Sequence, residues 1–202
     1  MSNDTEIKDK VREDVYDEEL LNRLLDENDI DQFRDEFLSM HNYEQSEYFE
    51  DTDENNRQKI FEFLSPKEVA NFFDQLDIDD EDYEELFDKI NANYASHVLE
   101  EMSYDNSVDI LNKLSKPKVA SLLTLMDKDE ANEIKALLHY EEDTAGGIMT
   151  TEYISLKTTT PVKEALMHVK EQALDAETIY VIFALNEAGQ LVGVLSLRDF
   201  IT

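Results

Sequence analysis

Three copies of one pattern of small and apolar residues follow one another through the middle of this 202-residue chain. The copies begin at Leu64, Ile90 and Leu114, 26 and then 24 residues apart, and an altered fourth copy begins near Leu138. Each copy predicts a helix, a tight turn and a second helix, with a small Ala or Ser that lets neighbouring helices approach closely. Units of this size that stack only on their neighbours form a right-handed or solenoid-like α-superhelix. The matching positions are Val69-Ala70, Phe72-Phe73 and Leu76; Ala95-Ser96, Val98-Leu99 and Met102; and Val119-Ala120, Leu122-Leu123 and Met126.

Helical periodicity also precedes this repeat. From Asp17 to Met40 apolar residues recur at helical spacing, which predicts two short helices broken near Asn28-Asp29. Residues 1–15 are polar and are expected to be flexible. We therefore expect one acidic helical domain over residues 16–140 and a junction over residues 141–150, which holds two of the four glycines. Chance periodicity is the alternative to a true repeat, but several identities fall in register.

The sequence after the junction alternates between strand and helix patterns. Its β-α-β-β-α order over residues 151–202 predicts a small α/β domain. The segments are a strand at Tyr153–Leu156, a helix from Pro161 to Ala173, strands at Ile179–Leu185 and Gln190–Leu195 joined by a turn at Asn186–Gly189, and a helix that begins at Ser196.

Negative charge is concentrated before the junction. Of the 49 acidic and 18 basic residues, 42 and 14 precede Thr150, and the formal net charge of the chain is −31. This charge argues strongly against nucleic-acid binding, because phosphates need Lys and Arg. Two interpretations remain open. The acidic residues only keep the protein soluble, or crowded carboxylates repel one another until a divalent cation bridges them.

Composition also bears on the cellular setting and on catalysis. The chain has no cysteine, which excludes a disulfide framework and fits a reducing compartment. It shows no signal peptide, and its longest apolar run, Ile179–Leu185, is too short to span a bilayer, so a soluble cytosolic piece is expected. Four scattered histidines argue against a zinc site, and neither a phosphate-binding glycine loop nor a nucleophile elbow is present. We therefore do not expect an enzyme.

Two segments together resemble a known family. The β-α-β-β-α order that ends in Gly-Val-Leu-Ser-Leu-Arg-Asp at Gly193–Asp199 is similar to a CBS domain, a module that pairs with a second copy to bind adenosyl ligands. It is preceded by Asp-Thr-Ala-Gly-Gly-Ile-Met-Thr at Asp143–Thr150. With the acidic repeats, these segments resemble the cytosolic part of MgtE-type magnesium transporters over essentially the whole chain. The resemblance implies an all-α superhelix, the family's N domain, followed by an incomplete first CBS unit.

The resemblance further implies a magnesium-sensing domain that regulates a homodimeric magnesium channel. In the family, Mg²⁺ bound among acidic faces of the N domain, the CBS pair and a linker helix holds the pore closed. When magnesium falls, the domains loosen and the pore opens. The expected partners are the protein's own transmembrane domain and a second CBS unit, both outside these 202 residues, so this chain is not expected to conduct ions. The expected location is the cytoplasmic face of the cell membrane.

Three residues are candidate magnesium ligands. Asp105 and Asp109 are four positions apart, so a helix over about Asp105–Leu114 places both carboxylates on one face, where a cation would relieve their repulsion. The alternative is that Asp105 only suits the first helical turn and Asp109 is solvated.

The resemblance matches both aspartates to magnesium-binding acids of the N domain, and Gly147 to a glycine whose carbonyl is a ligand. Gly147 also suits a helix C-cap or a hinge. Asn71 stands where other members can have an acidic residue, which weakens the expectation of one family ion site.

Arg198 and Asp199 are candidate nucleotide-binding residues. They match the end of the CBS signature, where the Asp takes ribose hydroxyls and the Arg approaches phosphates; the alternative is an N-capped helix with a surface ion pair. Val181 stands where an aromatic residue would stack on adenine, which weakens the expectation of a bound adenine nucleotide. Besides magnesium sensing, two functions therefore remain open: an acidic α-solenoid scaffold for protein interactions, and an adenosine-nucleotide sensor.

Overall fold

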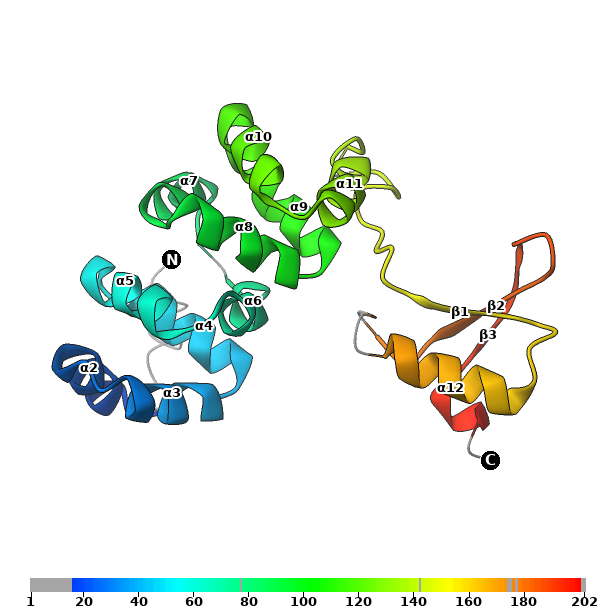
Figure 1. The fold of residues 1–202 in the computed structure, drawn as a ribbon, viewed down its shortest axis with the longest axis horizontal. Coiled ribbons are helices and arrows are strands. Elements are labelled where there is room, and N and C mark those ends of the chain that lie inside the picture. Colours follow the sequence, from blue (N-terminus) through cyan, green and yellow to red (C-terminus); the bar gives the residue numbers. More distant parts are fainter. Residues whose placement is uncertain (1–15, 77, 142, 174–175, 177, 201–202) are drawn as a thin grey trace, which may run out of the picture. The chain divides into compact units, whose positions relative to one another are not determined.

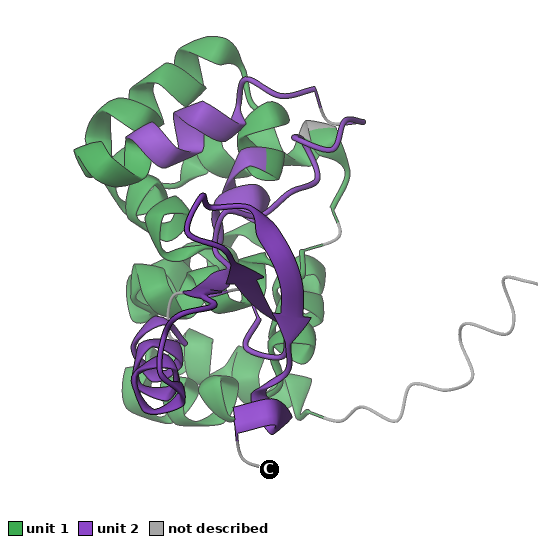
Figure 2. Cartoon of the chain, turned by 90° about the vertical axis from the view of Figure 1, so that its right-hand side faces the viewer, with its two compact units in different colours: residues 1–102, 109–131 green, residues 103–108, 132–202 purple. Residues whose placement is uncertain are grey.

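The computed structural model describes residues 16–76, 78–141, 143–173, 176 and 178–200, which form two compact units (Figures 1 and 2). Unit 1 comprises residues up to 102 together with 109–131, and unit 2 comprises residues 103–108 together with 132–202. The segment 1–15, for which flexibility is expected, lies outside the described residues.

Short helices follow one another through the acidic part of the chain (Figure 1). Each is eight to ten residues long. The predicted break near Asn28 is confirmed, since this residue ends the first of them with a φ of 54°. No strand occurs among the described residues before Ile154, also as predicted. The helices are α2 (Glu18–Glu27), α3 (Ile30–Ser39), α4 (Asn42–Asp51), α5 (Glu54–Phe63), α6 (Pro66–Phe73), α7 (Asp80–Lys89), α8 (Ala92–Glu101), α9 (Tyr104–Asn112), α10 (Lys116–Leu125) and α11 (Lys128–Leu137).

The three repeat copies are helix pairs, as predicted: α6 with α7, α8 with α9, and α10 with α11. Within unit 1, α8 packs against both α6 and α10, and α6 also packs against α4. The small residues at equivalent positions of the first two copies, Ala70 and Ser96, are buried, whereas Ala120 of the third copy is exposed. The close approach that a small residue allows is therefore used by the first two copies and not by the third.

The core of unit 1 changes from aromatic to aliphatic along the chain. The Phe72 ring lies edge-on to Phe37, with centroids 5.6 Å apart, and 5.4 Å from the ring of Phe49. Such aromatic pairs add about 0.5–1.5 kcal/mol beyond the area they bury. Farther along, Leu99 of α8 and Leu122 of α10 are buried in the corresponding positions. The apolar pairs of the repeat thus form the core.

The prediction of a fourth copy near Leu138 is wrong. Helix α11 ends at Leu137, and the described residues between 138 and 150 form turns. Gly146 and Gly147 fall in this segment, and each glycine disfavours a helix by about 1 kcal/mol relative to alanine.

Aspartates cap several helices from within their own sequence. Asp17, Asp29 and Asp53 precede α2, α3 and α5, and each accepts a hydrogen bond from a first-turn N–H. These bonds satisfy part of the four N–H groups that every helix start leaves unpaired.

Glutamates cap two further helix starts from a different repeat copy. The carboxylate of Glu84 in α7 accepts hydrogen bonds from the N–H (2.7 Å) and the hydroxyl (2.8 Å) of Ser115, which precedes α10. Glu100 in α8 accepts a bond from the N–H of Asp127, which precedes α11. The two bonds from Ser115 hold the pKa of Glu84 below its ordinary value. Capping thus links different copies, the first with the third through Glu84 and the second with the third through Glu100, as well as ending single helices.

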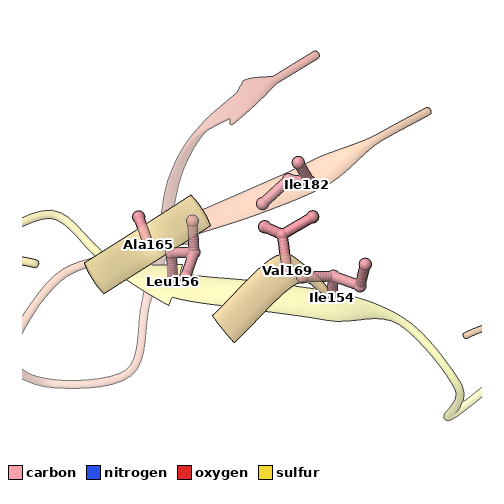
Figure 3. Packing of buried hydrophobic residues seen from close by; sticks show 5 residues of the cluster. All are labelled: Ile154, Leu156, Ala165, Val169 and Ile182. Carbon is pink, nitrogen blue, oxygen red and sulfur yellow. The ribbon is translucent and has the colours of Figure 1, made fainter. Parts of the chain in front are cut away.

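Unit 2 contains a three-stranded sheet with strand order β1-β2-β3, in which β1 and β2 are parallel and β2 and β3 antiparallel. Its elements are β1 (Ile154–Lys157), α12 (Val162–Gln172), β2 (Ile182–Leu185), β3 (Leu191–Leu195) and a 3₁₀ turn, η1 (Leu197–Phe200). The predicted order is confirmed, although β2 begins at Ile182 rather than Ile179. Helix α12 packs on the sheet through a small cluster (Figure 3) of Ile154, Leu156, Ala165, Val169 and Ile182.

The pH dependence of the Glu84 cap is testable with Glu84→Gln. Because the folded-state pKa of Glu84 is lowered, its charge stabilises the fold above the ordinary value of 4.5. That contribution is lost as pH falls through the folded-state pKa. We therefore expect Glu84→Gln to lower Tm at pH 7, and the difference from the parent to shrink progressively below about pH 4.5. Glu133→Gln, at an exposed position of α11, is the control; an equal, pH-independent loss in both variants would contradict the cap.

Candidate functional site

Asp105 and Asp109 lie one turn apart on α9, which runs from Tyr104 to Asn112 rather than to Leu114. Asp105 is half-buried in the first turn, and Asp109 is exposed. The Oδ1 atom of Asp105 is buried and has no hydrogen-bond partner. A buried carboxylate oxygen without a donor is unfavourable. Asp105 therefore has one oxygen that a cation would satisfy.

A glutamate from far along the chain caps the start of α9. Tyr104 donates its N–H to Oε2 of Glu152 at 2.7 Å, and both residues belong to unit 2. The hydroxyl of Ser103, directly before the helix, is buried and makes no hydrogen bond. Glu152 is not among the residues that the sequence singles out, because no spacing pattern connects residues 48 positions apart.

The two junction glycines have different structural roles. A Cβ atom on Gly146 would lie 2.2 Å from Cδ1 and 2.5 Å from Cγ of Tyr140, so the tyrosine ring occupies the space that a side chain would need. Gly147 is half-buried and donates its N–H to the carbonyl (3.0 Å) and the hydroxyl (3.2 Å) of Thr144. Neither glycine has a positive φ. A left-handed C-cap at Gly147 is therefore not formed.

The candidate ligands suit magnesium by their chemistry. Asp105 and Asp109 would supply carboxylate oxygens and Gly147 a carbonyl oxygen, the hard ligands that this ion prefers. No group of three or more His, Asp and Glu side chains within the described part of the chain could hold a metal ion. Magnesium is commonly bound through one or two carboxylates while it keeps several waters. The two carboxylates of α9 therefore fit the ion as part of a ligand set, and the role of Gly147 stays a prediction.

Asp199 is engaged in a local turn. Its Oδ2 accepts hydrogen bonds from the N–H (2.7 Å) and hydroxyl (2.9 Å) of Ser196, and these bonds lower its pKa. The alternative to nucleotide binding was an N-capped helix with a surface ion pair; the structure has a 3₁₀ turn here, and the nucleotide-binding role of Arg198 and Asp199 stays a prediction. Nearby, Tyr180 and Val181 are 76% and 40% exposed, so an apolar surface is open beside β2.

A separate cavity of about 510 Å³ lies between β1 and α12. Lys157, Glu164, His168 and Glu171 contribute its charged or titratable side chains. Arg198 and Asp199 do not line it. The candidate nucleotide residues and this cavity are therefore distinct features of unit 2.

Two family models match the chain from residue 40 onward. The model for the MgtE intracellular N domain matches residues 40–143, and that for the CBS domain matches residues 145–202. None of the described helices has both the length and the apolar character needed to cross a membrane.

Curated relatives carry the name magnesium transporter MgtE. The protein of Enterococcus faecalis is 43% identical over 182 residues, which cover 90% of this chain and 40% of that protein. The protein of Bacillus subtilis is 28% identical over 193 residues, covering 95% of this chain and 42% of that protein. The chain therefore spans about two fifths of the length of these relatives.

Two solved structures share the fold. The soluble part of a magnesium transporter is 43% identical, with a TM-score of 0.86, over 92% of this chain and 72% of that one. The cytosolic domain of the Mg²⁺ channel MgtE in complex with ATP is 32% identical, with a TM-score of 0.80, over 90% of this chain and 73% of that one.

The contact between Gly146 and Tyr140 predicts an unusual cost for a small substitution. Gly146→Ala should lower the free energy of unfolding by about 1 kcal/mol, the low end of the cost of overpacking because the Tyr140 ring is 48% exposed and can shift; urea denaturation measures the change. Gly193→Ala is the matched control, because nothing lies within 4 Å of its added Cβ. In a Tyr140→Ala background the cost of Gly146→Ala should largely disappear. An equal cost in both backgrounds would contradict the steric explanation.

Proposed function

Because this chain belongs to the MgtE family, whose intracellular N domain matches residues 40–143, we propose that it is the magnesium-sensing regulatory part of a magnesium transporter. The observation that carries this proposal is the buried Oδ1 of Asp105, which no protein group satisfies. It lies one turn before a second carboxylate, Asp109, on a helix of the matched N domain.

The proposed mechanism is electrostatic. Like charges one turn apart on a helix destabilise it by a few tenths of a kcal/mol, and the net charge of −31 adds a general repulsion. A bound Mg²⁺ supplies concentrated positive charge and accepts oxygen ligands. Asp105, Asp109 and the carbonyl of Gly147 are the residues of this chain that would hold it, with further ligands from solvent or from other parts of the protein.

Regulation follows from a difference in affinity between conformations. A cation shifts an equilibrium only by as much as it binds one state better than the other. We propose that the closed state of the whole transporter, at the cytoplasmic face of the membrane, has the better-formed acidic sites. High magnesium then favours closure and low magnesium favours opening.

The proposed partners include a second CBS unit and the transmembrane domain. Strand β3 exposes Leu191, Val192 and Val194 at 59%, 56% and 62%, an apolar edge that a soluble protein normally covers. We propose that a second CBS unit covers this edge, and that the whole protein is a homodimer.

An adenine nucleotide is the second candidate ligand, because a relative of 32% identity has been solved with ATP. We propose that Arg198 approaches its phosphates and that Asp199 takes its ribose hydroxyls. Since Asp199 already accepts two bonds from Ser196, the nucleotide must bind through the remaining lone pairs or displace those bonds.

The magnesium proposal predicts a specific stabilisation of the folded chain. At ten times the dissociation constant, a single site adds about 1.4 kcal/mol to the free energy of unfolding. Asp105→Asn with Asp109→Asn should remove most of this gain while leaving the magnesium-free chain as stable or slightly more stable. Thermal unfolding measures the gain, and small-angle scattering measures the accompanying compaction.

Two controls separate a site from screening. Sodium chloride at matched ionic strength reports the nonspecific contribution. Asp129→Asn with Glu133→Gln removes two exposed acids at the same spacing from α11 and should keep the full magnesium response. If sodium chloride stabilises the chain as much as magnesium does, the effect is nonspecific screening and the sensing proposal fails.

A further inference from the structure

Helix α9 does not use the cap that its own sequence provides. Ser103 occupies the N-cap position, since its carbonyl accepts the N–H of Ser107 at 2.9 Å. A serine there normally accepts a first-turn N–H with its hydroxyl, but this hydroxyl makes no hydrogen bond. A different donor of the same helix start, the N–H of its first residue Tyr104, donates to Glu152 at 2.7 Å.

Glu152 is itself held in place. It is half-buried, and its own N–H donates to the hydroxyl of Thr150 at 3.1 Å. Two residues later β1 begins, and this strand pairs with β2 from Ile154 onward. Glu152 therefore lies between a local turn at Thr150 and the start of the sheet at Ile154.

The hydrogen bond from Tyr104 to Glu152 holds the residue next to the candidate magnesium ligand Asp105. Tyr104 directly precedes Asp105, whose Oδ1 is buried without a donor. A carboxylate at a helix start satisfies an unpaired N–H, complements the helix dipole and forms a charge-assisted hydrogen bond. Losing this bond would let the first turn of α9 fray, and Asp105 lies in that turn.

We propose that Glu152 is a positioning residue for magnesium: it anchors the start of α9 and thereby holds the Asp105 carboxylate where the ion is bound. The inference rests on the proposed magnesium-sensing function. It assigns to the segment leading into β1 the role of setting the orientation of a ligand on the preceding helix. Glu152 does this without contacting the ion.

Hydrogen exchange in the absence of magnesium tests the anchor on the whole 202-residue chain. Glu152→Ala should speed amide exchange in the first turn of α9 about five-fold, the effect of losing a typical helix cap. Glu152→Gln retains an acceptor oxygen at the same reach but loses the charge assistance, so its exchange should lie between that of the parent and that of Glu152→Ala. Glu152→Asp retains the charge but is one methylene shorter, so it should behave like Glu152→Ala. Glu171→Ala, at an exposed position of α12, is the control and should leave α9 unchanged.

Magnesium titration of the same variants tests the positioning. Fraying reduces the fraction of molecules with Asp105 in place, so Glu152→Ala and Glu152→Asp should weaken magnesium binding by up to about five-fold. Glu152→Gln should weaken binding less than either of them, because it keeps the reach of the acceptor. This order separates position from charge, because the variant that keeps the charge is the more impaired one.

Each contrary result identifies what has failed. Parent-like exchange in both Glu152→Ala and Glu152→Asp overturns the anchor and leaves the proposed function intact. Magnesium binding that is weak in Glu152→Gln and normal in Glu152→Asp also overturns it, because the charge then acts directly. Absence of specific magnesium binding by the parent overturns the inference together with the proposed function.

Discussion

This structure depends on finding hydrogen-bond partners for the N–H and carbonyl groups at the ends of its helices. A helix of ten residues leaves four N–H and four carbonyl groups without intrahelical partners, so short helices need partners at their ends. In this chain acidic side chains provide many of them. Some cap their own helix, as Asp53 does, and others cap a helix of a different segment, as Glu84 and Glu152 do. Part of the large negative charge therefore has a structural reason before any ligand is considered.

Capping and cation binding use carboxylates in different states. The Glu84 carboxylate has two donors from Ser115, and its charge is already stabilised. Asp199 is in the same situation with Ser196. Asp105 differs, because a buried oxygen of its carboxylate has no donor at all. This contrast distinguishes a candidate ligand from the many structural acids around it, which charge counting alone does not do.

The sequence predicted the architecture better than it predicted the site. Periodicity located the helix pairs and the βαββ order, because apolar positions such as Leu99 and Ile182 determine which face is buried. The predicted fourth copy near Leu138 is not formed. That prediction followed the apolar residues and gave too little weight to the two junction glycines, which disfavour a helix. Asp105 and Asp109 were placed on one helix face correctly. Their functional role stays a prediction, and the contacts of Glu152 and Tyr140 depend on folding that no local pattern reveals.

Whether a capping residue precedes or follows its helix in the sequence matters during synthesis. Glu84 and Glu100 precede the helices that they cap, by 31 and 27 residues, so each carboxylate has left the ribosome before its partner helix does. The cap of α9 has the opposite order, because Glu152 follows Tyr104 by 48 residues. At ordinary translation rates this gap corresponds to roughly 2–10 s. During that time the helix that carries Asp105 and Asp109 exists without its cap, so the nascent chain completes its candidate ion site only once the strand segment beyond the junction has emerged.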